Sequence, residues 1–239
     1  MAVWKAWIEG HDHDLRTLTK LFWEGDPLVA GGETDGWYIQ SNSLPDANDG
    51  LNLTAADSLI KSVNGVARAA DESFEPVRLT NRYTGPDGRS TTFVRGATAR
   101  LRSGGSMTAK ALIDGAPPPR QPARGPRYIR LAKQDDDVAF ALRVLGQPDP
   151  LDWYDIYKVW EIVKHAVRGR RQVAARGWAT HADIERLTAS ANHQRISGDK
   201  ARHARMPGVP AQDRVMKIDE ADAMVRRLVA AWIEAHPSY

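Results

Sequence analysis

A run of prolines divides this chain into two parts with different sequence patterns. The segment Asp114–Pro126 contains Pro117-Pro118-Pro119 and then Pro122 before it ends at Pro126. Proline has no amide hydrogen to donate and restricts its own φ, so clustered prolines interrupt both helices and sheet ladders. The segment therefore predicts a linker or a long exposed loop. We expect separate folding units before and after it.

The part before the proline run alternates between strand and helix patterns. Two helices are expected, one of them near residues 15–22 with Asp14 as its cap, and the other after Thr54. The strands are expected at residues 3–9, 36–40, 74–83, 91–101 and 107–113. The tetrapeptide Gly85–Gly88 is a strong turn signal between two of them. This order is typical of an α+β fold in which helices cover one face of an antiparallel sheet.

The part after the proline run is mainly helical in pattern. A short strand is expected over 127–131 and a helix over 134–145. Apolar residues spaced by three and four predict a long helix, with Trp153, Ile156, Trp160, Val163 and Val167 on one face. Further helices are expected from Thr180, where Thr180 and Asp183 form a capping-box pattern, and over 219–235.

These patterns predict three regions along the chain. The first is an α+β recognition or sensor domain over residues 1–115, and the second is a linker with a connecting helix over 116–149. The third is an α-helical C-terminal domain over 150–239. The chain has no cysteine and no apolar run near the roughly 20 residues that span a bilayer. Its first residues lack a signal-peptide pattern, so we expect a cytoplasmic protein without membrane contact.

Positive charge is concentrated in the predicted helical domain. Between Lys164 and Met206, ten lysines and arginines face three acidic residues. Because lysine and arginine neutralise phosphates, this excess indicates an anionic partner such as nucleic acid. A solvated arginine-rich surface has the same composition and stays open as an alternative.

A polar cluster in this basic region carries the strongest chemical signal. If the helix from Thr180 continues to Asn192, then Arg186 and His193 lie seven residues apart and share one face. The arginine can neutralise a phosphate oxyanion while a neutral histidine accepts a proton from a hydroxyl. Asn192 adds an amide donor, so we expect these three to be catalytic. The expected anion-binding residues are Arg195, Lys200, Arg202, His203 and Arg205.

The spacing of Arg186 and His193, within Arg186–His193, resembles the arginine-to-histidine motif of HEPN-domain ribonucleases. The resemblance implies RNA cleavage by attack of the RNA's own 2′-hydroxyl, without metal or cofactor, often across a homodimer interface. It also implies a role in bacterial antiviral defence or toxin systems. It assigns catalysis to Arg186 and His193, and positioning to Asn192. The chain departs from the motif at Leu187, where the family usually has a polar residue.

Other interpretations of the polar residues stay open. The cluster also fits a non-catalytic binding or scaffold module that recognises a nucleotide, a phosphorylated ligand or an acidic protein surface. A loop ordered by its own polar groups would have the same residues. His11-Asp12-His13-Asp14 offers ligands for a divalent metal, but its position before a helix favours a cap. We predict no metal site and no cofactor.

Overall fold

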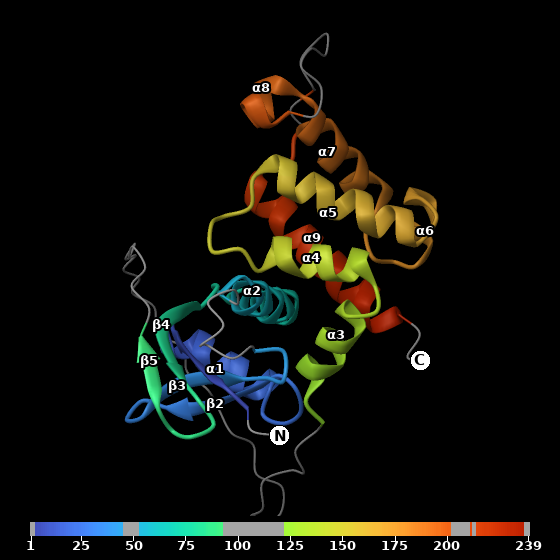
Figure 1. Cartoon of the computed structure of the whole chain (residues 1–239). Coiled ribbons are helices and arrows are strands. Elements are labelled where there is room, and N and C mark those ends of the chain that lie inside the picture. The colour runs from blue at the N-terminus through green and yellow to red at the C-terminus, as the bar shows by residue number, and fades with distance from the viewer. Residues whose placement is uncertain (1–2, 45–52, 93–121, 202–210, 212–213, 237–239) are drawn as a thin grey trace, which may run out of the picture.

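The protein has an α+β fold, as the sequence predicts, with an N-terminal antiparallel sheet followed by a helical region (Figure 1). The computed structural model describes residues 3–44, 53–92, 122–201, 211 and 214–236. Five described strands form one sheet in the order β2-β3-β1-β4-β5, and every pair is antiparallel. The strands are β1 Lys5–Glu9, β2 Leu28–Gly32, β3 Gly36–Gln40, β4 Arg78–Thr84 and β5 Ser90–Thr92.

One strand was not predicted, and another begins later than predicted. Strand β2 was not expected, because its two glycines do not favour a strand by composition. Strand β4 begins at Arg78 instead of residue 74. Asn64 explains the later start, since its side chain donates to Val77 O at 2.8 Å and accepts from Val77 N at 3.2 Å. The segment before β4 thus bonds to a helix side chain instead of a strand. The strand predicted over 91–101 is described only in its first two residues, which belong to β5, and the strand predicted over 107–113 lies outside the described residues.

Helices α1 (Asp12–Leu21) and α2 (Leu53–Ala70) lie against one face of the sheet (Figure 1). The cap of α1 is His11, whose side chain accepts from His13 N, so the prediction that Asp14 caps this helix is wrong. Asp14 is instead buried, and its Oδ1 accepts from Glu75 N at 3.0 Å. Because Asp14 lies inside the first turn, its carboxylate binds the backbone of a neighbouring segment instead of capping the helix.

Among the described residues, the helical region contains the helices predicted for it, one helix where a strand was expected, and two short helices that were not predicted. The described helices are α3 Arg124–Ala132, α4 Asp136–Leu145, α5 Trp153–Ala166, α6 Arg170–Ala175, α7 His181–Asn192, α8 Gln194–Ser197 and α9 Ile218–Ala235. A 3₁₀ turn at Gly198–Lys200 follows α8. The helices expected over 134–145, from Thr180 and over 219–235 are confirmed as α4, α7 and α9. The expected long helix is confirmed as α5, and its five apolar residues are buried or cap it.

Helix α3 replaces the strand predicted over 127–131. Pro126 lies in the first turn of α3, where a backbone amide has no partner within the helix, so proline is tolerated there. Tyr128 and Ile129 are buried on its inner side. Gly125 and Pro126 are also buried, so this end of the proline-rich segment is not an exposed linker.

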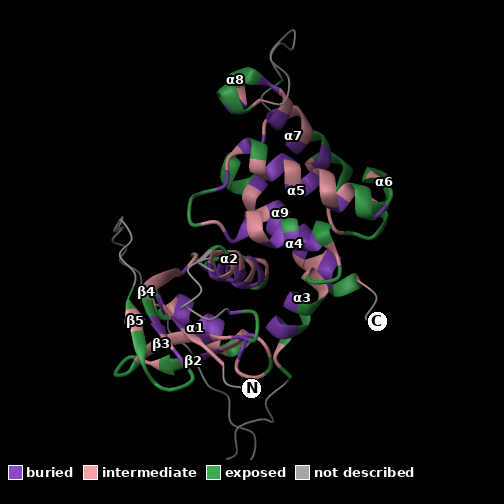
Figure 2. Ribbon diagram, in the orientation of Figure 1, coloured by how far each residue is buried: buried purple, intermediate pink, exposed green. Residues whose placement is uncertain are grey.

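One hydrophobic core extends from the sheet into the helical region. Figure 2 shows buried residues in α2, α4, α5, α7 and α9, and the core cluster runs from Ala6 to Ile233. Helices α2 and α4 touch at Gly65, where an added Cβ would lie 2.0 Å from Leu142 O. The predicted division at residues 115 and 150 remains a prediction about folding units. Within the described ranges, no helix is long and apolar enough to cross a membrane.

Candidate functional site

Helix α7 carries the predicted catalytic residues Arg186 and Asn192, and His193 caps its end. Thr180 begins the helix, since its Oγ1 accepts from Asp183 N at 3.1 Å. The helix runs to Asn192, as the predicted pairing requires. His193 is only 5% exposed, and its Nδ1 accepts from Arg195 N at 3.2 Å, so the ring also caps α8. Its position is that of a buried capping residue.

Arg186 binds the start of helix α9. Its Nη2 donates to Glu220 Oε2 at 2.7 Å and to Val215 O at 3.1 Å. Its Nη1 lies 3.9 Å from Asp183 Oδ1, one turn earlier on α7. The guanidinium therefore links α7 to α9 and already has acceptors of its own. The geometry around Arg186 is that of a structural contact between helices.

The predicted anion-binding residues have different surroundings. Lys200 Nζ lies 3.0 Å from Asp152 Oδ2, so its charge is partly compensated by the residue that caps α5. Partial burial raises the pKa of Asp152, but hydrogen bonds from Asp155 N and Lys200 outweigh it and leave that pKa below its usual value. Arg195 is exposed. Arg202, His203 and Arg205 lie outside the described residues.

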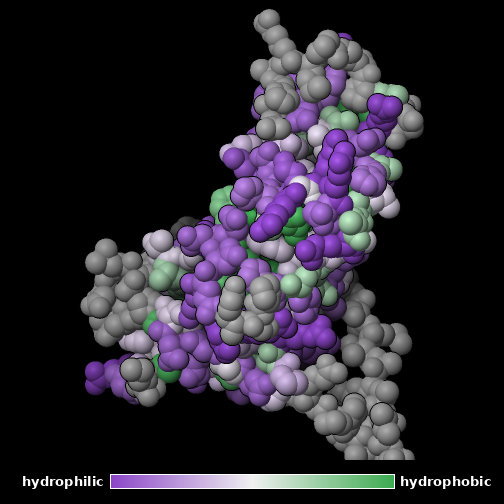
Figure 3. All heavy atoms as spheres, turned by 90° about the vertical axis from the view of Figure 1, so that its right-hand side faces the viewer, coloured by the Kyte–Doolittle hydropathy of each residue, from purple (hydrophilic) through white to green (hydrophobic). Residues whose placement is uncertain are grey.

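A second group of cations lies where α5 turns into α6. We call Arg168, Arg170, Arg171 and Arg176 the arginine corner. All four are exposed, and Figure 3 shows strongly hydrophilic side chains on the side of the molecule that carries α6. No carboxylate of the described residues lies within ion-pair distance of these guanidinium groups. The corner is therefore a concentration of positive charge that has no ion pair with the described carboxylates.

The backbone holds the arginine corner in place. Arg168 has a φ of 62° and Gly169 a φ of 119°, and this pair of positive φ values turns the chain sharply after α5. Gly169 N donates to Lys164 O at 2.8 Å, which closes the end of α5. Val173 is fully buried beneath α6, and the Arg176 guanidinium lies 5.2 Å from the ring centroid of Trp178. The basic side chains thus extend from a turn and a short helix that are packed against the core.

The residues of the arginine corner belong to the basic excess between Lys164 and Met206, but they were not among the predicted site residues. The mixture of histidine, asparagine and arginine at 191–205 suggested chemistry, whereas the corner contains mainly one residue type. The signal that could have found it is the run from Lys164 to Arg176, which contains five lysines and arginines and no acidic residue. Composition could not show that these arginines are exposed and have no carboxylate partner among the described residues. That depends on which residues from distant parts of the chain pack nearby.

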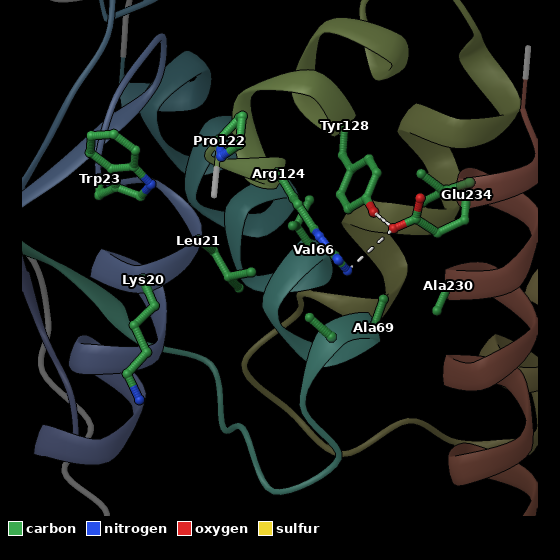
Figure 4. A pocket seen from close by; sticks show the side chains of 12 residues that line it. Lys20, Leu21, Trp23, Val66, Ala69, Pro122, Arg124, Tyr128, Ala230 and Glu234 are labelled. Carbon is green, nitrogen blue, oxygen red and sulfur yellow. Dashed lines mark hydrogen bonds and ion pairs between the residues drawn. The ribbon is translucent and has the colours of Figure 1, made fainter. Parts of the chain in front are cut away.

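A pocket of about 670 Å³ opens between α1, α2, α3 and α9 (Figure 4). Tyr128 Oη donates to Glu234 Oε1, and Arg124 Nη1 lies 3.6 Å from the same oxygen. Burial, and then the hydrogen bond to Glu234, raise the pKa of Tyr128 above its usual value. Tyr128 and Arg124 therefore both bind Glu234, and these contacts link α3 to α9. Sequence reasoning missed the pocket because its residues come from four distant segments.

The predicted catalytic residues do not form a recognisable reaction centre. The motif His11-Asp12-His13-Asp14 does not form one either. Arg186, Asn192 and His193 do not line the pocket of Figure 4. In the motif, His13 Nε2 lies 3.1 Å from Ser73 Oγ and 3.3 Å from Asp71 Oδ2. The described ranges contain no group of three or more histidines, cysteines and carboxylates that could hold a metal ion.

Comparison with known proteins leaves the resemblance to HEPN-domain ribonucleases untested. No family model matches the chain, and no curated protein or solved structure shows significant similarity to it. Function must therefore be argued from the arrangement of this chain's own residues.

Proposed function

We propose that this protein binds nucleic acid, and that the arginine corner contacts the phosphate backbone. The observation that carries the proposal is the exposure of four guanidinium groups, without a carboxylate partner among the described residues, over one packed turn. Arginine is suited to this role because its planar fork donates two parallel hydrogen bonds to a phosphate. The contacts would be to the backbone, so they would favour nucleic acid without selecting a base sequence.

The geometry supports binding better than cleavage. Cleavage by the predicted pair needs a free guanidinium and an accessible imidazole next to one RNA phosphate. Arg186 instead donates to Glu220 and Val215, and His193 is buried at the junction of two helices. We therefore propose an RNA- or DNA-binding protein and assign no catalytic step to this pair.

A comparison of two variants with equal charge loss tests the role of the arginine corner. The corner variant replaces Arg168, Arg170, Arg171 and Arg176 by alanine. The control variant replaces four exposed arginines elsewhere by alanine, namely Arg16, Arg130, Arg214 and Arg227. Both lose the same net charge, so a difference between them reports the position of the charges. Affinity for a fluorescently labelled RNA is measured by anisotropy at several salt concentrations.

We expect the corner variant to lose more than about tenfold in affinity and the control variant to lose much less. Each lost phosphate contact should also reduce the slope of log affinity against log salt by about 0.7 to 0.9. Equal losses in the two variants would show that net charge alone matters and would contradict a site at the corner. Circular dichroism checks that both variants remain folded.

A further inference from the structure

The sheet has a second face, which carries aromatic rings and cations instead of core residues. Side chains alternate along β1, so Ala6 and Ile8 are buried against the helices while Lys5 and Trp7 lie on the opposite face. The register pairs Trp7 with Tyr38 of β3, which places both rings on that face. Arg82 of β4 joins them. We call Lys5, Trp7, Tyr38 and Arg82 the outer sheet face.

The four side chains of the outer sheet face contact one another in a defined geometry. The rings of Trp7 and Tyr38 meet edge to face, with centroids 5.7 Å apart. The Arg82 guanidinium lies 4.2 Å from the centroid of Trp7, and Lys5 Nζ lies 4.4 Å from the centroid of Tyr38. Trp7 Nε1 donates to Thr84 Oγ1 at 2.8 Å, which orients the indole. The two adjacent rings therefore each carry one cation, and the four side chains come from three neighbouring strands.

The pairing of β4 with β1 is irregular next to this cluster of side chains. Ala6 pairs with Tyr83 while Ile8 pairs with Leu79, so β4 has extra residues opposite Trp7. Bulges change the direction of side chains at one point of a sheet. Here the irregularity accompanies the placement of Arg82 over the indole. The register on both sides of the bulge keeps the core side chains Tyr83 and Ile8 on the inner face.

We propose that the outer sheet face binds unpaired nucleotides of a single-stranded nucleic acid. Bases would stack on Trp7 and Tyr38, and Lys5 and Arg82 would move from the ring faces to the adjoining phosphates. Stacking of a base on an aromatic ring accepts any base sequence, because every base has a π-face. A duplex does not fit this surface, since its bases already stack on one another. This inference rests on the proposed function and narrows its ligand to single strands.

The charges favour a nucleic acid over a protein partner at this face. An acidic protein surface would pair with Lys5 and Arg82 but would leave the two ring faces unused. A single strand supplies both chemical groups, with a phosphate next to each base. In Figure 1 the sheet lies in the lower half of the molecule and α6 in the upper half, so the outer sheet face and the arginine corner can be tested separately.

The test uses oligonucleotides of about four nucleotides, which are long enough to cover one small binding surface. Uridine RNA and thymidine DNA of this length are titrated into the full chain, and binding is followed through the indole N–H resonances. The Trp7 resonance is assigned with the variant Trp7→Phe. We expect the wild-type Trp7 resonance to shift with both probes. A blunt-ended, GC-rich duplex that is long enough to stay fully paired should leave it unchanged.

Variants of Trp7 and Tyr38 then distinguish the loss of an aromatic ring from the loss of the folded structure. Trp7→Leu and Tyr38→Leu should each weaken short-strand binding by about tenfold, whereas Trp7→Phe should retain most of it because a ring remains. The control variant, which lacks four exposed arginines outside both surfaces, should bind the short strands as the wild type does. If a leucine variant fails to fold, the wild-type resonance shifts and the Trp7→Phe affinity still decide the question.

The outcomes distinguish this inference from the proposed function. Unchanged Trp7 resonances, or equal shifts with the duplex, would overturn the role of the outer sheet face. If longer RNA then still binds through the arginine corner, the proposed function stands without it. If neither short nor long nucleic acids bind the wild-type protein, both proposals fail.

Discussion

At the scale of single residues, Arg186 illustrates how a side chain suited to catalysis serves as a structural contact. It joins α7 to the first turn of α9 through a carboxylate and a backbone carbonyl. Removing it would leave Val215 O without this donor and Glu220 without its closest cation. Both acceptors are partly accessible to water, so the loss in stability should be modest, near that of an ordinary hydrogen bond.

We predict that Arg186→Ala lowers the free energy of unfolding by about 1 kcal/mol and changes RNA affinity by less than twofold. Urea denaturation and fluorescence anisotropy measure the two quantities. The control is Arg195→Ala, which removes an exposed arginine in the short helix after α7 and should leave stability unchanged. A stable Arg186→Ala protein that has lost an RNA-cleaving activity of the wild type would restore the catalytic interpretation.

The sequence correctly placed Arg186 and Asn192 on one helix that ends beside His193, because helical periodicity is a local property. It could not identify the partners of Arg186, since Glu220 belongs to another helix and no local spacing relates the two. The same limit applies to Lys200, whose partner Asp152 lies far earlier in the chain. The positions of these side chains along their helices were therefore predictable. Their availability to a ligand was not, because it depends on long-range packing.

At the scale of elements, the contact between α2 and α4 links the sheet to the helical region. Gly65 lets the two helices approach closely, and an added Cβ there would meet Leu142 backbone atoms at 2.0 to 2.9 Å. Arg68 Nη1, one turn later on α2, donates to Leu145 O at 2.8 Å and so binds the end of α4. The sequence did not indicate a role for Gly65, because the need for a glycine in a helix depends on which element packs against it.

We predict that Gly65→Ala lowers the free energy of unfolding by about 1–3 kcal/mol. Alanine normally favours a helix over glycine by about 1 kcal/mol, but here the backbone of α4 must move to accept the methyl group. Urea unfolding is followed by tryptophan fluorescence and by circular dichroism. The control Gly32→Ala places a methyl group where nothing lies within 4 Å and should change stability little.

One transition, seen at the same midpoint by both probes, is the expected result of that unfolding experiment. The core is continuous from Ala6 to Ile233, so loss of the α2–α4 contact should weaken both regions together. Two separate transitions, with only one shifted by Gly65→Ala, would instead support the division of the chain into independent folding units. A stabilised Gly65→Ala protein would contradict the close contact itself.

At the scale of the whole molecule, charge and aromatic residues are distributed over two surfaces on one connected core. The α+β class was predictable because strand alternation and helical spacing are strong in most of the elements. Strand β2 and helix α3 were not, since glycine in the first and Pro126 in the second oppose the structures that tertiary packing stabilises. The outer sheet face was equally hidden, because it depends on the pairing of strands distant in sequence.

The central claim is that this protein binds nucleic acid through phosphate contacts, and the salt dependence of wild-type binding tests it most directly. Affinity for a labelled RNA of about 20 nucleotides is measured between about 50 and 200 mM salt. If four arginines each contact a phosphate, log affinity should fall against log salt with a slope of about −3 or steeper. Absence of binding at the lowest salt, or binding with a slope near zero, would contradict the account.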